Sequence, residues 1–124
     1  MIEETVSTDQ LLHRVKKAYS ELQPFEVHYG LRALRLTHIT PATRDTVRWC
    51  IALQSLGIPI TPPLLTHLSN RPYESTLAIL HRLGDNNILT LIRDGKRSLI
   101  YILHPRTHRY LNPTQLAKRM EAST

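Results

Sequence analysis

Residues 61–103 read TPPLLTHLSNRPYESTLAILHRLGDNNILTLIRDGKRSLIYIL. Thr61 before two prolines is typical of a helix start, because the threonine side chain caps free N–H groups and proline suits the first turn. Ser69-Asn70 ends this short helix, and a second helix is predicted over about 72–83. Only about three residues around Asn70 separate the two helices. That separation indicates a helix-turn-helix.

A β-hairpin is predicted directly after the second helix. The runs 88–93 and 98–103 are rich in apolar and β-branched residues, and Asp94-Gly95 lies between them. Two such runs around Asp-Gly are a strong hairpin signal, because this dipeptide accepts the positive φ angles of a tight turn. A further helix is predicted over about 43–56. The order from residue 43 is therefore helix, short helix, helix, strand, basic turn, strand.

This order resembles that of the winged-helix transcription regulators of the MarR and ArsR type. In that family the second helix carries a small polar pair, followed by apolar residues at fixed intervals, and two apolar residues open the wing. This chain matches the pattern with Glu74-Ser75-Thr76, Leu80, Leu83, Asn87 and Ile88-Leu89. It departs at Thr76, where Val or Ile is usual, and at Asn87, where Gly is usual. Both are tolerable, since Thr is β-branched and Asn accepts positive φ.

The resemblance covers residues 43–104, about half of the chain. A helix with a continuous apolar stripe is predicted over 8–22, and a shorter one over 113–122. Residues 25–42 stay open between a strand and a short helix, because their apolar residues fit both periods. The expected fold is mainly α with a small β-hairpin, a winged helix-turn-helix with extra N- and C-terminal helices. The expected parts are an N-terminal helix and linker (1–42), a DNA-binding domain (43–104) and a C-terminal helix (105–124).

The charge of the chain is unevenly placed. The formal net charge is +6, but residues 1–30 hold three basic and five acidic residues, a balance of −2. Residues 31–124 hold thirteen basic and five acidic residues, a balance of +8. A basic body suits a polyanionic partner, because neutralised phosphates release counterions. A solvated basic surface is the alternative.

The second helix of the helix-turn-helix has two distinct faces. At 100° per residue, Thr76, Leu80 and Leu83 centre one face and form a core stripe. The opposite face is polar, and proteins of this fold read bases mainly from the N-terminal half of this helix. The candidate DNA-contacting residues are Arg71, Tyr73, Glu74, Ser75 and Ala78 near the groove, with His81 and Arg82 nearer the backbone.

Several of these positions have a structural alternative. Tyr73 lies at the edge of the core face and is compatible with packing inside. Glu74 suits a helix N-terminus, where negative charge is stabilised, and Arg82 suits the C-terminus of the helix. His81 is compatible with a solvated surface position. Arg71 has the geometry to pair with guanine, and Ser75 can bond to a base or a phosphate.

The predicted wing carries Arg93, Lys96 and Arg97 around the Asp94-Gly95 turn. Arginine at a wing tip suits a narrow A·T-rich minor groove, and lysine suits a phosphate. Protection of a strand edge by charge is the alternative. Arg106 and Arg109 follow the hairpin and are candidates for contacts with the DNA backbone.

In the family resembled, extra terminal helices build a homodimer, which places two recognition helices in successive major grooves. The resemblance therefore implies dimerisation through the apolar stripes of the two terminal helices. The alternative is that both helices pack on the core of their own chain. The candidate dimerisation residues are Leu11, Leu12, Val15, Tyr19, Leu22, Leu116 and Met120.

Other functional classes find little support in the sequence. One cysteine, Cys50, excludes an internal disulfide framework, and its neighbours favour a buried, inert thiol. His104 and His108 have a zinc-like spacing, but Pro105 between them disfavours a continuous helix. No catalytic motif, cofactor motif or membrane-length apolar run is present, so no enzyme, cofactor, metal or membrane partner is expected. The acidic start argues against a secretory signal and favours a cytoplasmic protein.

The sequence thus predicts a sequence-specific double-stranded DNA-binding protein, a dimeric transcription regulator. Two other interpretations stay open. One is a winged-helix module that binds proteins, and the other is a DNA-binding accessory of replication, partition or a mobile or viral element. No small-molecule effector can be predicted from the sequence.

Overall fold

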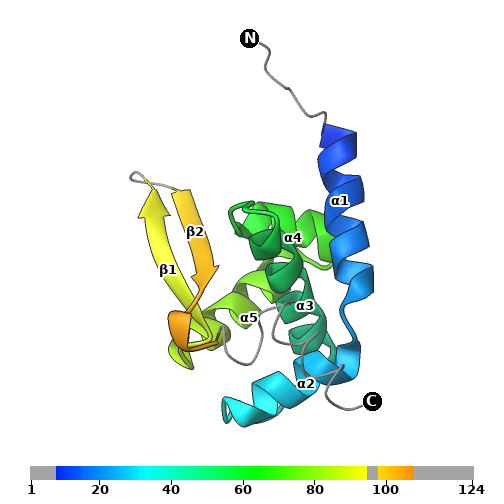
Figure 1. Cartoon of the computed structure of the whole chain (residues 1–124). Helices are drawn as coiled ribbons and strands as arrows, with labels where there is room; N and C mark the ends of the chain where they lie inside the picture. The colour runs from blue at the N-terminus through cyan, green and yellow to red at the C-terminus, as the bar shows by residue number, and fades with distance from the viewer. Residues whose placement is uncertain (1–7, 95–97, 108–124) are drawn as a thin grey trace.

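The computed structural model describes residues 8–94 and 98–107. This part of the chain forms five α-helices, an antiparallel hairpin and a short 3₁₀ turn (Figure 1). None of the described helices is both long and apolar enough to cross a membrane. The elements are α1 Thr8–Glu21, α2 Pro24–Ala33, α3 Pro41–Ser55, α4 Pro62–Ser69, α5 Tyr73–Asp85, β1 Leu89–Asp94, β2 Ser98–Leu103 and η1 Pro105–Thr107.

Helix α3 lies at the centre of the molecule, with α1 along one side and α4 and α5 on the other (Figure 1). It contacts α1, α2, α4, α5 and β2. Its apolar residues are consequently buried on more than one side, and Val47, Cys50, Ile51 and Leu53 are all at most 1% exposed. α3 begins at Pro41, two residues before the predicted start, because the Thr40 hydroxyl accepts a hydrogen bond from the Thr43 N–H at 3.1 Å.

The segment with two possible interpretations forms a helix, α2, over most of its first half. Residues four apart share one face of a helix, so Val27 and Leu31 turn inward, where both are 0% exposed. Phe25 and Tyr29 turn outward and are 53% and 65% exposed. In a strand, all four of these alternating residues would lie on one face, whereas the helix separates them into an inner and an outer pair. The alternation of apolar residues therefore could not separate the two structures.

The hairpin follows α5 through a defined helix end. Asn87 has a φ of 59°, its N–H bonds to the Gly84 carbonyl, and the next N–H, from Ile88, bonds to the Leu83 carbonyl at 2.9 Å. These two bonds make a Schellman motif, in which the left-handed residue reverses the chain. The prediction that Gly84 lies beyond the helix is wrong, because α5 continues to Asp85 and Asn87 alone takes the positive φ.

The hairpin is also attached to the helices. Its register pairs Leu89 with Leu103 at the base and Asp94 with Ser98 toward the turn. The segment between α3 and α4 adds a bridge, in which the Tyr101 N–H bonds to the Ile60 carbonyl at 2.8 Å. These bonds fix the wing beside α5.

Candidate nucleic-acid interface

The helix-turn-helix consists of α4, a three-residue connection and α5. Thr61 caps α4 by accepting a long hydrogen bond of 3.4 Å from the Leu64 N–H, and two prolines fill the first turn, as predicted. Asn70 ends α4 with a φ of 58°, which turns the chain toward α5. The predicted core stripe of α5 is confirmed, since Thr76, Leu80 and Leu83 are at most 1% exposed.

The other side of α5 faces solvent. Tyr73 is 46% exposed, so its alternative as a core residue does not apply. Ser75, Ala78 and His81 recur at intervals of three, which places them on one helical face, and all three are exposed. Tyr73 and Glu74, in the first turn of α5, are exposed as well. Their exposure is compatible with DNA contact, which stays a prediction.

Arg71, in the connection before α5, is held by a carboxylate. Its Nη2 lies 3.5 Å from Oδ2 of Asp45, and the two side chains are 34% and 21% exposed. Nε of Arg71 is buried and has no hydrogen-bond partner among the described residues. The described protein groups therefore satisfy only part of this guanidinium.

Asp45 also binds α1, through Tyr19. The Tyr19 hydroxyl donates to Oδ1 of Asp45, and the Tyr19 ring stacks on Trp49 with centroids 3.8 Å apart. The Arg48 guanidinium lies 3.9 Å from the centroid of the Tyr19 ring and donates through Nε to the Tyr19 carbonyl at 3.0 Å. Burial, and then the bond to Asp45, raise the pKa of Tyr19. One carboxylate thus links α1, α3 and the turn before α5.

Arg82, at the other end of α5, binds backbone rather than a carboxylate. Its two terminal nitrogens donate to the carbonyls of Thr37 and His38, the second at 3.0 Å. Both acceptors lie in the connection between α2 and α3. Arg82 therefore ties that connection to α5, a contact that the sequence interpretation did not include.

The predicted wing contacts are only partly placed. Arg93 lies in β1 and Arg106 in η1, where the backbone alone is described. Lys96, Arg97 and Arg109 lie outside the described residues. Contacts of all five with DNA stay predictions.

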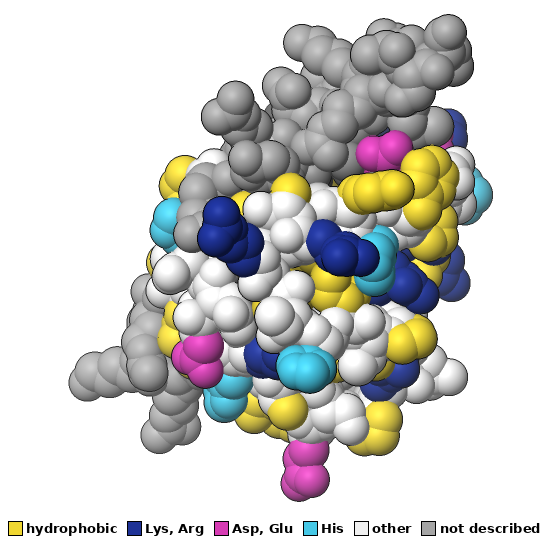
Figure 2. Space-filling view, turned by 90° about the horizontal axis from the view of Figure 1, so that it is seen from below, with side chains coloured by type: hydrophobic (Ala, Val, Ile, Leu, Met, Phe, Trp, Pro, Cys, Tyr) yellow, Lys and Arg dark blue, Asp and Glu magenta, His cyan; other side chains and the backbone are white. Residues whose placement is uncertain are grey.

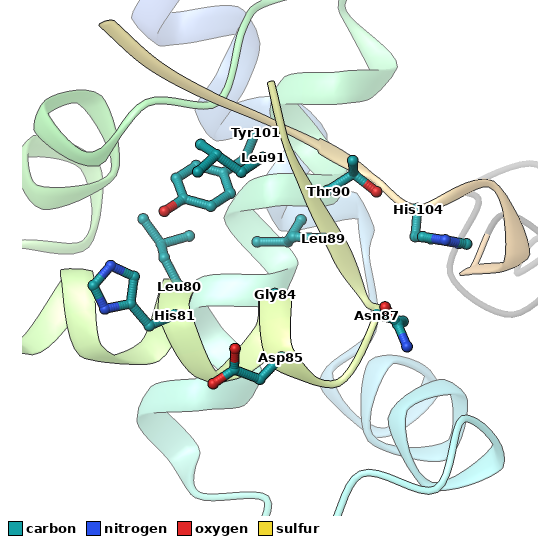
Figure 3. A pocket seen from close by; sticks show the side chains of 10 residues that line it. All are labelled: Leu80, His81, Gly84, Asp85, Asn87, Leu89, Thr90, Leu91, Tyr101 and His104. Atoms are coloured by element: carbon teal, nitrogen blue, oxygen red, sulfur yellow. The ribbon is translucent and has the colours of Figure 1, made fainter. Parts of the chain in front are cut away.

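A pocket of about 430 Å³ lies between α5 and the hairpin (Figure 3). Leu80 and Leu89 line its interior, together with the ring of Tyr101. His81 and Asp85 lie on its α5 side (Figure 3). Helix α5 and the predicted wing are therefore adjacent, and this pocket separates their exposed parts.

The predicted dimerisation residues divide between core and surface. Val15 and Leu22 are 2% and 7% exposed and belong to the core of their own chain. Tyr19 packs on Trp49, Leu12 is half-buried, and Leu11 is 38% exposed. Part of the α1 stripe thus serves the chain itself. Leu116 and Met120 lie outside the described residues.

Cys50 is fully buried, as predicted, and burial raises the pKa of its thiol. A buried neutral thiol is a poor nucleophile and metal ligand, since the thiolate is the reactive form. Within residues 8–94 and 98–107, no group of three His, Cys, Asp or Glu side chains could hold a metal ion. His108 of the predicted histidine pair lies outside this part.

Comparison with solved structures finds three similar folds, whereas no protein-family profile and no curated protein matches the sequence. Rv1404 from Mycobacterium tuberculosis has a TM-score of 0.58 and 21% identity, over 98% of this chain and 79% of that one. Apo MarR from E. coli has a TM-score of 0.47 and 16% identity, over 98% and 87%. The M. tuberculosis MarR family protein Rv2887, solved with p-aminosalicylic acid, has a TM-score of 0.43 and 24% identity, over 94% and 76%.

These likenesses concern the fold. The likeness to Rv1404 agrees with the predicted helix-turn-helix, hairpin and N-terminal helix, which the described residues contain. The C-terminal helix predicted over 113–122 lies outside the described residues. The chain has a winged helix-turn-helix fold that is mainly helical, of the type its resemblance to MarR-like regulators predicted.

Proposed function

We propose that this protein binds double-stranded DNA and regulates transcription. The observation that carries the proposal is the two-sided α5. Its inner face is buried against the core, and its outer face presents Ser75, Ala78 and His81 directly after a helix-turn-helix turn. A helix presented in this way fits the major groove, which is wide enough for one helix.

The residues have distinct roles in the proposal. Ser75 and Glu74 contact base edges or phosphates, and the small Ala78 lets the helix approach the groove closely. Arg71 contacts a base or a phosphate from the start of α5, and the basic wing contacts the adjacent groove or backbone. The net charge of +6 supplies the attraction to DNA that does not depend on sequence.

We further propose that the protein acts as a homodimer in the cytoplasm. Two copies related by a two-fold axis would place their α5 helices about one turn of DNA apart, ~34–36 Å, and select an inverted repeat. Selection of clustered direct repeats would favour the role in replication, partition or a mobile element.

A negative charge introduced on the exposed face of α5 tests the proposal. The replacement Ala78→Glu puts a carboxylate against the DNA and should weaken binding at least about tenfold, because each good groove contact is worth ~1–3 kcal/mol. Ala33→Glu is the matched control, since Ala33 is also exposed but belongs to α2, outside the helix-turn-helix. The measurement is fluorescence anisotropy with random and pool-selected duplexes over a salt series.

The outcomes separate the hypotheses. Absence of binding by the unchanged protein to either duplex at low salt rejects DNA binding and favours the protein-interaction module. Equal binding by Ala78→Glu and Ala33→Glu removes α5 from the interface while leaving DNA binding intact.

A further inference from the structure

A second pocket, of about 410 Å³, lies between α2 and the start of α3, and none of its lining residues belongs to α5. The face of the molecule on which α2 lies carries hydrophobic side chains beside histidine and Lys or Arg side chains (Figure 2). We call this pocket the α2 cleft. It is lined by Pro24, Phe25, His28, Tyr29, Arg32 and Arg44.

The helical geometry of α2 explains why these side chains meet. Val27 and Leu31 are buried against the core, and Phe25, Tyr29 and Arg32 lie on the other side of the helix and are exposed. Phe25, Tyr29 and Arg32 recur at intervals of four and three, so they occupy one exposed face. Arg44 joins them from the first turns of α3. The cleft is therefore built by two packed helices rather than by a loop.

The cleft has an excess of positive charge. Among the described residues, neither Arg32 nor Arg44 is paired with a carboxylate. The polar contact of Arg44 is with His28, whose Nδ1 lies 3.4 Å from Nη1 of Arg44. Two guanidinium groups and an imidazole around one hollow favour an anion, and guanidinium groups bind phosphate with two parallel hydrogen bonds.

The cleft also exposes two aromatic rings. Phe25 and Tyr29 are 53% and 65% exposed, although rings of this size are usually covered. Flat rings beside arginines are the means by which proteins hold a nucleobase next to its phosphate, through stacking and charge. A volume of about 410 Å³ falls in the range of small-molecule sites.

We propose that the α2 cleft binds a small phosphorylated ring compound of the nucleotide class. Arg32 and Arg44 hold the phosphate, with His28 as an additional donor, and the base lies against Phe25 or Tyr29. A dianionic phosphate suits this site better than a monoanionic carboxylate, because two arginines line the cleft. The proposal does not depend on DNA binding.

Calorimetric titration of the full chain with adenosine 5′-monophosphate tests the ligand class. We expect saturable binding with one ligand per chain, at least about tenfold tighter than binding of inorganic phosphate or of adenosine alone, because both halves of the site contribute. Benzoate, a ring with a carboxylate, should bind more weakly still. Nucleotide binding no tighter than phosphate, or tighter binding of benzoate, would overturn the proposal.

Substitutions locate the site. Arg44→Gln and Arg32→Gln should each weaken nucleotide binding at least about tenfold, as expected for loss of a charge-assisted pair. Arg14→Gln, at an exposed position of α1, is the matched control and should leave binding unchanged. Tyr29→Ala should weaken nucleotide binding without changing phosphate binding. Circular dichroism verifies that each variant is folded.

One further variant separates this site from the proposed DNA interface. Ala78→Glu should leave nucleotide affinity unchanged, because α5 does not line the cleft. A parallel loss of nucleotide and DNA binding in this variant would place the nucleotide on the α5 face and overturn the cleft assignment. Unchanged nucleotide affinity in both arginine variants would overturn it as well.

Discussion

The two ends of α5 each carry an arginine, but these arginines are held in different ways. Before the helix, Arg71 faces the carboxylate of Asp45. Near its end, Arg82 donates to two backbone carbonyls between α2 and α3. A carboxylate neutralises a guanidinium and competes with phosphate for it, whereas a carbonyl anchors the guanidinium and leaves its charge in place. The sequence predicted DNA contacts for both arginines, with a role at the helix end as the alternative for Arg82. In the structure Arg71 contacts a carboxylate, whereas Arg82 contacts two backbone carbonyls.

The largest expected effect is the loss of stability on replacing Arg82. Arg82→Ala removes both hydrogen bonds to the α2–α3 connection, and loss of two such bonds should lower the free energy of unfolding by about 1–3 kcal/mol. Thermal unfolding should show a lower Tm by several degrees, ~2–8 °C per kcal/mol for domains of this size class. Arg14→Ala, on the exposed side of α1, is the control.

An unchanged Tm for Arg82→Ala would contradict the role of Arg82 as an anchor of the α2–α3 connection. A smaller dependence of DNA affinity on salt in the same variant would then return Arg82 to the list of phosphate contacts, with a change in slope of about 0.9.

The intermediate effect is a change in DNA affinity on replacing Asp45, the partner of Arg71. Asp45→Asn frees Arg71 from a competing charge and removes a negative charge near the proposed DNA surface. DNA affinity at low salt should rise about three- to tenfold, in line with the modest energies of partly exposed ion pairs. Asp9→Asn, in the first turn of α1, removes the same charge at an exposed site and should change affinity less.

This measurement distinguishes two roles of Asp45. Tighter binding identifies Asp45 as a competitor of DNA for Arg71. Weaker binding by Asp45→Asn would instead mean that the carboxylate orients Arg71 for its DNA contact. Arg71 would then, like Arg82, be held in place by its protein partner.

The smallest expected effect concerns Tyr19. Burial and the bond to Asp45 raise its pKa above the ordinary 10.0, so the folded chain favours the protonated phenol. The stabilisation is complete below the pKa of the unfolded chain and is lost as the pH rises through the folded-state pKa. Tyr19→Phe should lower stability by about 0.5–1.5 kcal/mol at neutral pH and flatten the alkaline decline. Denaturant unfolding between pH 7 and 11 measures both, and parallel declines would contradict the assignment.

Elements defined by neighbouring residues could be predicted from the sequence. The threonine and prolines at the start of α4, the left-handed asparagines after α4 and α5, and the two runs of β-rich residues each act within a few residues. Their signals are therefore visible in a linear reading. The exposed and buried faces of α5 follow from its period alone.

Contacts between distant residues could not be predicted. Tyr19 and Asp45 are 26 residues apart, and Arg82 is 44 residues from His38. Nothing in a local pattern links such pairs. The α1 stripe has the same limitation, because periodicity identifies an apolar face but not the surface that covers it. Val15 and Leu22, which the sequence offered for dimerisation, lie in the core of their own chain.

The bonds from Arg82 to Thr37 and His38 have a consequence for how the protein can be cut. A fragment starting at residue 43 would lose both acceptors, and it would also lose the α1 and α2 residues that share the core with α3. Its central helix would then be uncovered on one side. Residues 43–104, the proposed DNA-binding part, thus share one core with the helices that precede them. We expect that a minimal fragment for screening or crystallisation has to keep these helices.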